Sequence, residues 1–188
     1  MAAVAPLPLV RLGELEPAAP HDQVAAFYDS LPPVTVAEMI GAWKGSEIAT
    51  GHPFDGLLGP SGWHGKNFRS AEDVDPLVFR GKDGNLFAGD PARMPMGLLE
   101  RFPRLSRHPA NAALFRALSP HLLRTSKPKA RLRMTEYRGA TSATMVYDDL
   151  PINDVFRKVD ADTMLGAMDI RGHAEPFFFV LHREDRQP

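Results

Sequence analysis

The sequence predicts a mainly β protein, an antiparallel β-barrel of about eight to ten strands with two short N-terminal helices and one helix between two groups of strands. From Ala130 onward, alternating apolar and polar runs are separated by turn residues at intervals of about ten positions, which is typical of an antiparallel meander. Between Pro53 and Pro109, proline and glycine recur too often for a long helix. A closed barrel would hide the strand edges.

The N-terminal part begins with two short helical patterns. The first carries Val24, Phe27 and Tyr28 at helical spacing and is ended by Pro32 and Pro33. The second covers residues 36–40, where Thr35 is a capping residue and Glu38 occupies the capping-box position. A third helix is expected in residues 108–123, beginning near Pro109 and ending at Pro120.

Strands follow these helices in two groups. The first group is expected around residues 43–51, 63–68 and 77–79. The second is expected in ARLRMTEY, ATSATMVYD, NDVFRKVD, DTMLGAMDIRG and PFFFVLHRE, with turns at residues 138–139, 149–151, 160–162 and 172–176. The nearly continuous apolar run 177–181 predicts a strand buried on both faces.

Composition limits the classes of function. A chain of 188 residues that is 44% hydrophobic predicts one domain, with a flexible segment over 1–20 and barrel halves over 21–110 and 111–188. A net charge of −1 without a basic run argues against nucleic-acid binding. The absence of cysteine excludes disulfides and thiolate metal sites. No apolar stretch reaches the roughly 20 residues of a membrane span, so we expect a soluble cytoplasmic protein; a homodimer is left open.

Several motifs together resemble a known family. Gly41-Ala42-Trp43-Lys44-Gly45 is a Gly-x-Trp-x-Gly pattern, and the second half carries matching segments at residues 138–139, 142–148, 150–152 and 154–160. From roughly Val24 to Arg183 the chain resembles the GXWXG family of bacterial proteins with its companion C-terminal domain of unknown function. That family is distantly similar to the calycins, which include lipocalins, fatty-acid-binding proteins and haem-binding nitrobindins. The resemblance implies a ligand-holding barrel.

The segment 40–68 holds both tryptophans and the first candidate polar groups. Trp43 either plugs one end of the barrel, with its N–H on a backbone carbonyl, or contacts a ligand. His52 stands at a strand end and is either a pocket residue that moves protons or a structural hydrogen-bonding group. By alternation Lys66 shares a face with Phe68, and Trp63 lies on the other face. If Phe68 points inward, Lys66 is a buried amine that meets a carboxylate or has a lowered pKa; otherwise it lies at the surface.

The second half supplies the remaining candidates. Asp148 either faces inward as the partner of His52 or Lys66 or caps the turn before Pro151. The candidate catalytic residues are therefore His52, Lys66, Asp148 and Tyr147. The candidate ligand-binding residues are Trp43, Trp63, Phe68, Tyr137, Met145, Phe156 and Phe178.

The sequence favours binding of a small hydrophobic molecule, with or without a carbonyl or carboxylate group, inside the barrel. The alternative is a cofactor-independent isomerase or lyase that transfers a proton on an unsaturated carbonyl compound. A weaker alternative is haem binding, in which the nitrobindin likeness would assign the iron ligand to His182. No Cys-x-x-Cys-His, His-x-His or His-Glu-x-x-His spacing occurs, so we expect no metal and no cofactor.

Overall fold

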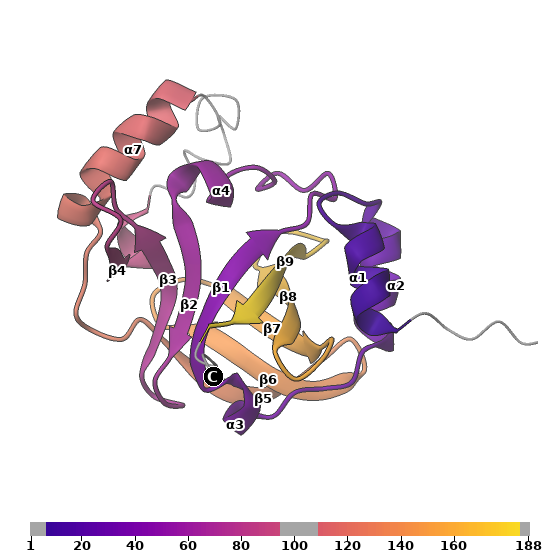
Figure 1. The fold of residues 1–188 in the computed structure, drawn as a ribbon. Helices are drawn as coiled ribbons and strands as arrows, with labels where there is room; N and C mark the ends of the chain where they lie inside the picture. The colour runs from indigo at the N-terminus through magenta and orange to yellow at the C-terminus, as the bar shows by residue number, and fades with distance from the viewer. Residues whose placement is uncertain (1–6, 95–108, 185–188) are drawn as a thin grey trace, which may run out of the picture.

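The described part of the chain forms one antiparallel sheet that closes on itself. A computed structural model describes residues 7–94 and 109–184. Nine strands follow the order β2-β1-β9-β8-β7-β6-β5-β3-β4, and β2 also pairs with β3, so all strands except β4 form a ring (Figure 1). The strands are β1 (Gly41–Glu47), β2 (Trp63–Phe68), β3 (Val74–Arg80), β4 (Leu86–Ala88), β5 (Ala130–Tyr137), β6 (Ala140–Tyr147), β7 (Ile152–Lys158), β8 (Thr163–Ile170) and β9 (Phe177–Arg183).

The predicted C-terminal meander is confirmed from β5 to β9, because each of these strands pairs with the next one along the chain. At the β5–β6 hairpin, Arg138 and Gly139 have φ angles of 49° and 75°. Two successive positive φ values are what a two-residue hairpin turn with the twist of the sheet requires. Strand pairing in the ring is shortest between β3 and β5, where Val74 and Ala130 are the one pair of residues in register.

The helices lie outside the ring. The two predicted N-terminal helices are α2 (His21–Ser30) and α3 (Val36–Met39), and the predicted Thr35–Glu38 capping box is present. The helix between the strand groups is α7 (Pro109–Leu122), which continues past Pro120. Among the described residues, the short helices α1 (Pro8–Leu15), α4 (Leu58–Ser61) and η1 (Pro91–Arg93) were not predicted, and neither was strand β4. Among the described residues, no helix is long and apolar enough to cross a membrane.

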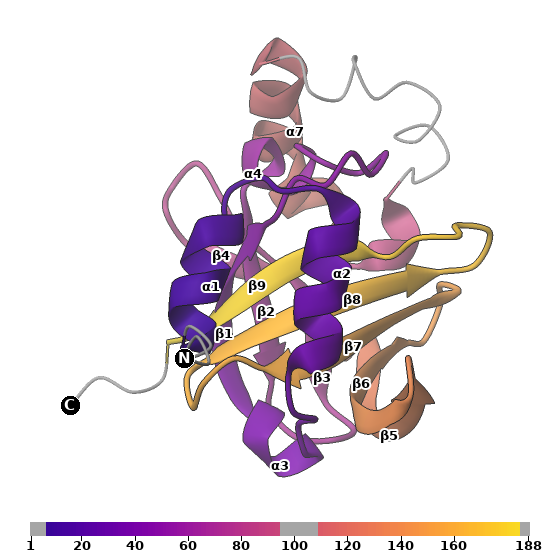
Figure 2. The ribbon, with the colours of Figure 1, turned by 90° about the vertical axis from the view of Figure 1, so that its right-hand side faces the viewer.

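Helix α1 corrects the expectation that residues 1–20 are flexible. Within the described part of that segment, Leu12 and Leu15 are buried, at 2% and 1% exposure. Both side chains belong to the apolar cluster that α1 and α2 form against the outer face of β8 and β9 (Figure 2). The burial of two leucines supplies the driving force that orders this short helix, which by itself would be marginal in water.

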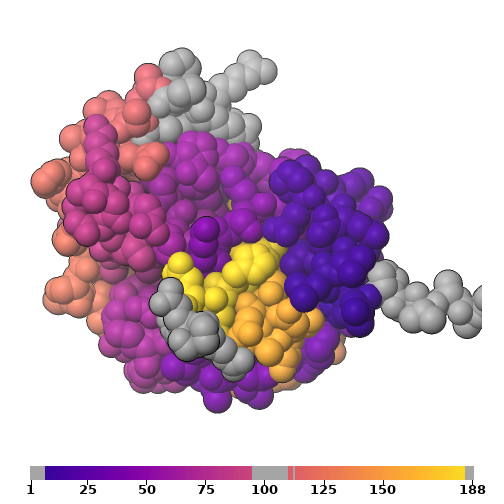
Figure 3. All heavy atoms as spheres, viewed as in Figure 1, coloured from indigo at the N-terminus to yellow at the C-terminus, as the bar shows by residue number. Residues whose placement is uncertain are grey.

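Two apolar cores lie on opposite faces of the sheet. Phe177, Phe179 and Leu181 of β9 point into the ring, whereas Phe178 and Val180 point out under the helices. The prediction that this strand is buried on both faces is therefore confirmed. In the space-filling view, the N-terminal helices cover one flank of the molecule beside the C-terminal strands (Figure 3).

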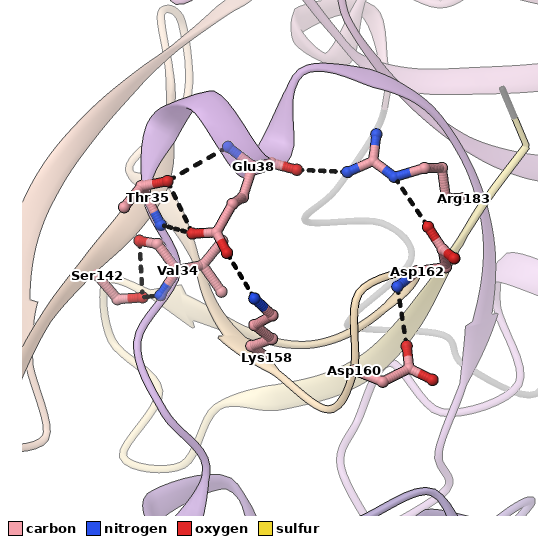
Figure 4. A network of polar contacts seen from close by, with 8 residues as sticks. All are labelled: Val34, Thr35, Glu38, Ser142, Lys158, Asp160, Asp162 and Arg183. Carbon is pink, nitrogen blue, oxygen red and sulfur yellow. Dashed lines mark hydrogen bonds and ion pairs between the residues drawn. The ribbon is translucent and has the colours of Figure 1, made fainter. Parts of the chain in front are cut away.

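One end of the ring is closed around α3 by a polar network (Figure 4). Lys158 of β7 donates to Glu38 at 2.7 Å, and Glu38 also accepts from Thr35 in the capping box. Arg183 of β9 donates to the carbonyl of Glu38 and contacts Asp162 at 3.5 Å. These contacts tie α3 to β7 and β9 of the second half of the chain and fix the entry into β1.

Candidate functional site: a buried lysine, aspartate and tyrosine

Lys66 is a buried amine inside the ring. Its side chain is 3% exposed and lies on the face of β2 that Phe68 shares, as alternation predicted. The Nζ atom lies 2.7 Å from Oδ2 of Asp154 and donates to the carbonyl oxygen of Pro76 at 3.0 Å. Of the two sequence-based alternatives, the structure therefore supports the buried lysine that meets a carboxylate.

The partner carboxylate is Asp154, which sequence reasoning did not select. It lies on β7 between Ile152 and Phe156, which point into the same interior cluster. Its side chain is fully buried, and burial raises its pKa above the ordinary 3.8, while the neighbouring Lys66 opposes the rise. The signal was present in the sequence: an aspartate that shares a strand face with the apolar residues Ile152 and Phe156.

Tyr147 completes the polar cluster. Its hydroxyl oxygen lies 3.5 Å from Lys66 Nζ, at the end of β6. Burial, and then the negative charge of Asp154, raise the pKa of the phenol well above its ordinary value. The phenol therefore stays protonated at neutral pH and can donate a hydrogen bond.

Aromatic rings surround the amine. Lys66 Nζ lies 4.9 Å from the ring centre of Phe179, 5.7 Å from that of Trp63 and 5.8 Å from that of Tyr147. Such contacts stabilise a cation in an apolar interior. Farther in, Phe68 and Phe156 meet edge to face at 5.7 Å, and Met145 is fully buried beside them in the same cluster.

The position of Trp63 differs from the strict alternation expected for β2, which placed it on the face opposite Lys66. It lies in the same interior cluster as Lys66 because the pairing of β2 with β3 shifts register on both sides of Gly65. A Cβ atom at Gly65 would lie 1.9 Å from the carbonyl oxygen of Trp43, so only glycine fits there. Gly45 has a similar role, since its missing Cβ leaves room for the Trp63 ring.

The polar atoms of this interior are not equally satisfied. Asp154 is ion-paired with Lys66 at 2.7 Å and interacts with the Tyr147 hydroxyl. Nε1 of Trp63 has no hydrogen-bond partner within the described residues. Buried polar groups are usually satisfied, so this indole N–H beside a buried ion pair calls for an explanation.

Trp43 lies at the end of the ring that α3 closes. Its Nε1 donates to the carbonyl of Met39 at 2.8 Å, the backbone partner expected from the sequence. The guanidinium of Arg183 stacks on the ring at 4.1 Å and donates to the carbonyl of Ile40. Trp43 thus has a satisfied N–H and a covered face, which fits the architectural alternative.

His52 lies beyond the end of β1, among the rings of Phe54, His173 and Phe177 at 5.3–5.6 Å. Its Nδ1 accepts from the backbone N–H of Phe54. Burial, and then the proximity of His173, lower the pKa of His52 below the ordinary 6.5. None of these contacts of His52 involves Lys66, Asp154 or Tyr147.

Three other sequence candidates lie outside the interior cluster. Phe178 packs under α2 against Tyr28, with ring centres 5.8 Å apart, and Tyr137 packs against the same outer cluster. Asp148 follows β6 and contacts Arg131 at 3.6 Å, with 37% of its side chain exposed. We therefore leave these three residues out of the candidate site.

No metal centre is evident in the described ranges 7–94 and 109–184, where no three His, Cys, Asp or Glu side chains are arranged to hold an ion. His182, the residue considered for haem, is exposed on β9 near Thr163. It alternates with Leu181, which points into the ring, so its imidazole faces away from the interior cluster.

Comparisons with known proteins agree with this architecture. Residues 26–84 match the family described as GXWXG protein, and residues 128–183 match the domain of unknown function DUF4334. A crystal structure of a protein from Thermomonospora curvata is similar, with a TM-score of 0.70 and 29% sequence identity over 94% of this chain and 98% of that one. No protein with a curated description matches the sequence. The chain belongs to the GXWXG family with its companion C-terminal domain of unknown function.

Proposed function

We propose that the closed ring acts as a calycin-like barrel that binds a small, mostly hydrophobic molecule through one polar oxygen group. The observation that carries this proposal is a polar group in the apolar interior, where the unpaired Nε1 of Trp63 lies on the ring that contacts the Lys66–Asp154 ion pair. An unsatisfied buried polar group costs about 1–3 kcal/mol. A ligand that pairs with the indole N–H would recover part of that cost on binding.

The charges of the site favour a neutral oxygen group. Lys66 and Asp154 compensate each other at 2.7 Å, so the polar cluster has no excess charge to neutralise a ligand. A carboxylate would bring one uncompensated negative charge into an apolar interior, which is costly. A hydroxyl group fits best, because it can donate to Asp154 and accept from the indole N–H of Trp63; a carbonyl can accept from Trp63 or Tyr147.

The hydrophobic part of the ligand would contact the aromatic walls. Phe179 and Trp63 lie beside the amine, and Phe68, Phe156 and Met145 extend the same apolar cluster. Aromatic and methionine side chains are common in sites for apolar small molecules. A compact aromatic alcohol or aldehyde is therefore a suitable first probe.

The test is a fluorescence titration with cinnamyl alcohol, because the chain's two tryptophans, Trp43 and Trp63, both lie in the interior cluster. We expect saturable quenching, weakened about fivefold in Trp63→Phe, which removes one hydrogen bond of about 1 kcal/mol. Asp154→Asn should weaken binding, whereas Asp149→Asn, at an exposed turn position, should not. The absence of saturable quenching with the alcohol and the aldehyde would overturn the proposal.

A second candidate function is cofactor-independent proton transfer, as in an isomerase or lyase. The observation that favours it is the raised pKa of Asp154, caused by burial, beside the protonated phenol of Tyr147. A desolvated carboxylate is a stronger base, and a phenol can stabilise an enolate oxygen. The candidate base is then Asp154, whereas the sequence had pointed to His52 or Asp148.

This candidate is tested by NMR detection of deuterium exchange at the α-carbon of a β,γ-unsaturated ketone in the presence of the protein. Proton transfer by a positioned base contributes about a hundredfold or more, so Asp154→Asn should lose exchange by that factor while Asp149→Asn retains it. Exchange that is equal in the two variants would exclude Asp154 as the base.

A further inference from the structure

We propose that Lys66 forms a covalent imine with an aldehyde or ketone ligand, with Asp154 as the carboxylate partner of the resulting iminium ion. This inference rests on the proposed function, since the carbonyl compound must first enter the ring. It narrows the ligand class from a molecule with a polar oxygen to a molecule with a reactive carbonyl carbon. Three features of the interior carry it.

The first feature is the position of the amine. All lysines lie within the described residues; Lys66 is buried, and the others are exposed or partly exposed. A primary amine inside an apolar cluster meets a carbonyl ligand away from bulk water. Removal of water favours the imine, because hydrolysis is the reverse of its formation.

The second feature is a proton acceptor at contact distance. Asp154 Oδ2 lies 2.7 Å from Nζ, and burial raises the pKa of this carboxyl group, which favours its protonated form. The carboxylate can therefore take a proton from the ammonium group and leave a neutral amine to attack the carbonyl carbon. The Tyr147 hydroxyl, 3.5 Å from Nζ, can donate to the oxygen that becomes negative in this step.

The reaction balances without a further reactant. The neutral amine nitrogen forms a bond to the carbonyl carbon, and one of its protons moves to the oxygen to give the carbinolamine. The proton held by Asp154 then passes to this hydroxyl group, and the C–O bond breaks to release water. An ammonium ion and an aldehyde become a protonated imine and one water molecule, with the positive charge conserved. Lys66 and Asp154 therefore remain a cation and an anion before and after the reaction.

The third feature is the ring contacts of the cation. Phe179 and Trp63 lie 4.9 Å and 5.7 Å from Nζ, and they would flank the iminium as they flank the ammonium. The product charge is therefore already accommodated, by one carboxylate and two ring faces. The site needs no new charge partner to hold the covalent adduct.

The experiment is reductive trapping of the full-length protein with cinnamaldehyde and cyanoborohydride, followed by intact-mass and peptide-mapping mass spectrometry. We expect one adduct with the mass of the aldehyde less one oxygen atom, located on Lys66. The adduct should be absent in Lys66→Arg and retained in Lys82→Arg, because Lys82 is exposed. Asp154→Asn should trap about a hundredfold more slowly, the usual size of a positioned proton-transfer group.

The outcomes separate this inference from the proposed function. Saturable binding of cinnamyl alcohol without an adduct on Lys66 would overturn the imine and leave the binding function in place. Failure of both compounds to bind would overturn both. Adducts spread over surface lysines, unchanged in Lys66→Arg, would show that the interior amine has no special reactivity. The Lys66→Met/Asp154→Asn variant guards against misfolding, since it leaves no lone buried charge and should also lack the adduct.

Discussion

Replacing Lys66 by methionine would leave the Asp154 carboxylate alone in the apolar interior. The aspartate is 0% exposed, so the folded variant must hold a lone buried charge or protonate it. Protonating a carboxyl group of ordinary pKa 3.8 at neutral pH costs about 4 kcal/mol, at about 1.4 kcal/mol per pH unit. This agrees with the roughly 3–5 kcal/mol expected when one partner of a buried ion pair is removed.

The pH dependence follows from the same reasoning. In Lys66→Met the folded-state pKa of Asp154 lies above its unfolded value, so the folded state binds more protons and is destabilised as pH rises. We expect a loss of about 4 kcal/mol relative to the unsubstituted protein at neutral pH, which shrinks towards zero near about pH 4. Urea unfolding at several pH values measures both quantities.

The double variant Lys66→Met/Asp154→Asn is the matched control. With both charges removed, we expect stability to return to within about 2 kcal/mol of the unsubstituted protein, since an unpaired buried amide costs about that much. The losses of stability in the single variants Lys66→Met and Asp154→Asn should therefore not add up in the double variant. Additive losses, or a Lys66→Met loss that is independent of pH, would refute the buried ion pair.

Two further predictions test other parts of the structure. Gly45→Ala would place a Cβ atom 2.1 Å from the Trp63 ring and should cost about 1–3 kcal/mol of stability. Gly13→Ala on α1, where a Cβ atom would have no atom within 4 Å, should stabilise the protein by up to about 1 kcal/mol. Thermal unfolding measures both variants, and equal shifts in the melting temperature would contradict the position of Trp63. The hydrogen bond from Lys158 lowers the pKa of Glu38 to about 2, so its stabilisation is present above the ordinary 4.5 and is lost as pH falls through about 2. Glu38→Gln should therefore cost up to about 1 kcal/mol at neutral pH after allowance for solvent screening, and unfolding curves should converge with those of the unsubstituted protein in acid; a constant gap would argue against the pair.

The regular features of the second half of the chain could be predicted from local signals. Period-two alternation and turn residues are set within about ten positions, so β5 to β9 are found from the sequence. The capping box at Thr35 is equally local. Helix α1 could not be predicted in this way, because its order depends on burial of Leu12 and Leu15 against β8 and β9, which lie far along the chain.

The candidate site was predictable in part. Alternation with Phe68 placed Lys66 as a possible interior amine, but the partner depends on which face of β7 points inward. That face is decided by closure of the ring, which brings residues 66 and 154 together across the interior. Closure of the ring also decides which face of β9 points inward. Phe178 therefore lies in the outer core, although its neighbours Phe177 and Phe179 point inward. Local sequence carries the period of a strand but not its absolute orientation.

The most direct test of ligand binding inside the ring is the proton–nitrogen NMR spectrum of the two indole N–H groups, recorded with and without cinnamyl alcohol. The Trp43 N–H already donates to Met39, whereas the Trp63 N–H has no acceptor within the described residues. The account predicts a saturable downfield shift of the Trp63 signal, assigned with Trp63→Phe, and a Trp43 signal that moves much less. A Trp63 signal that stays in place at saturating alcohol would contradict a ligand site in the interior.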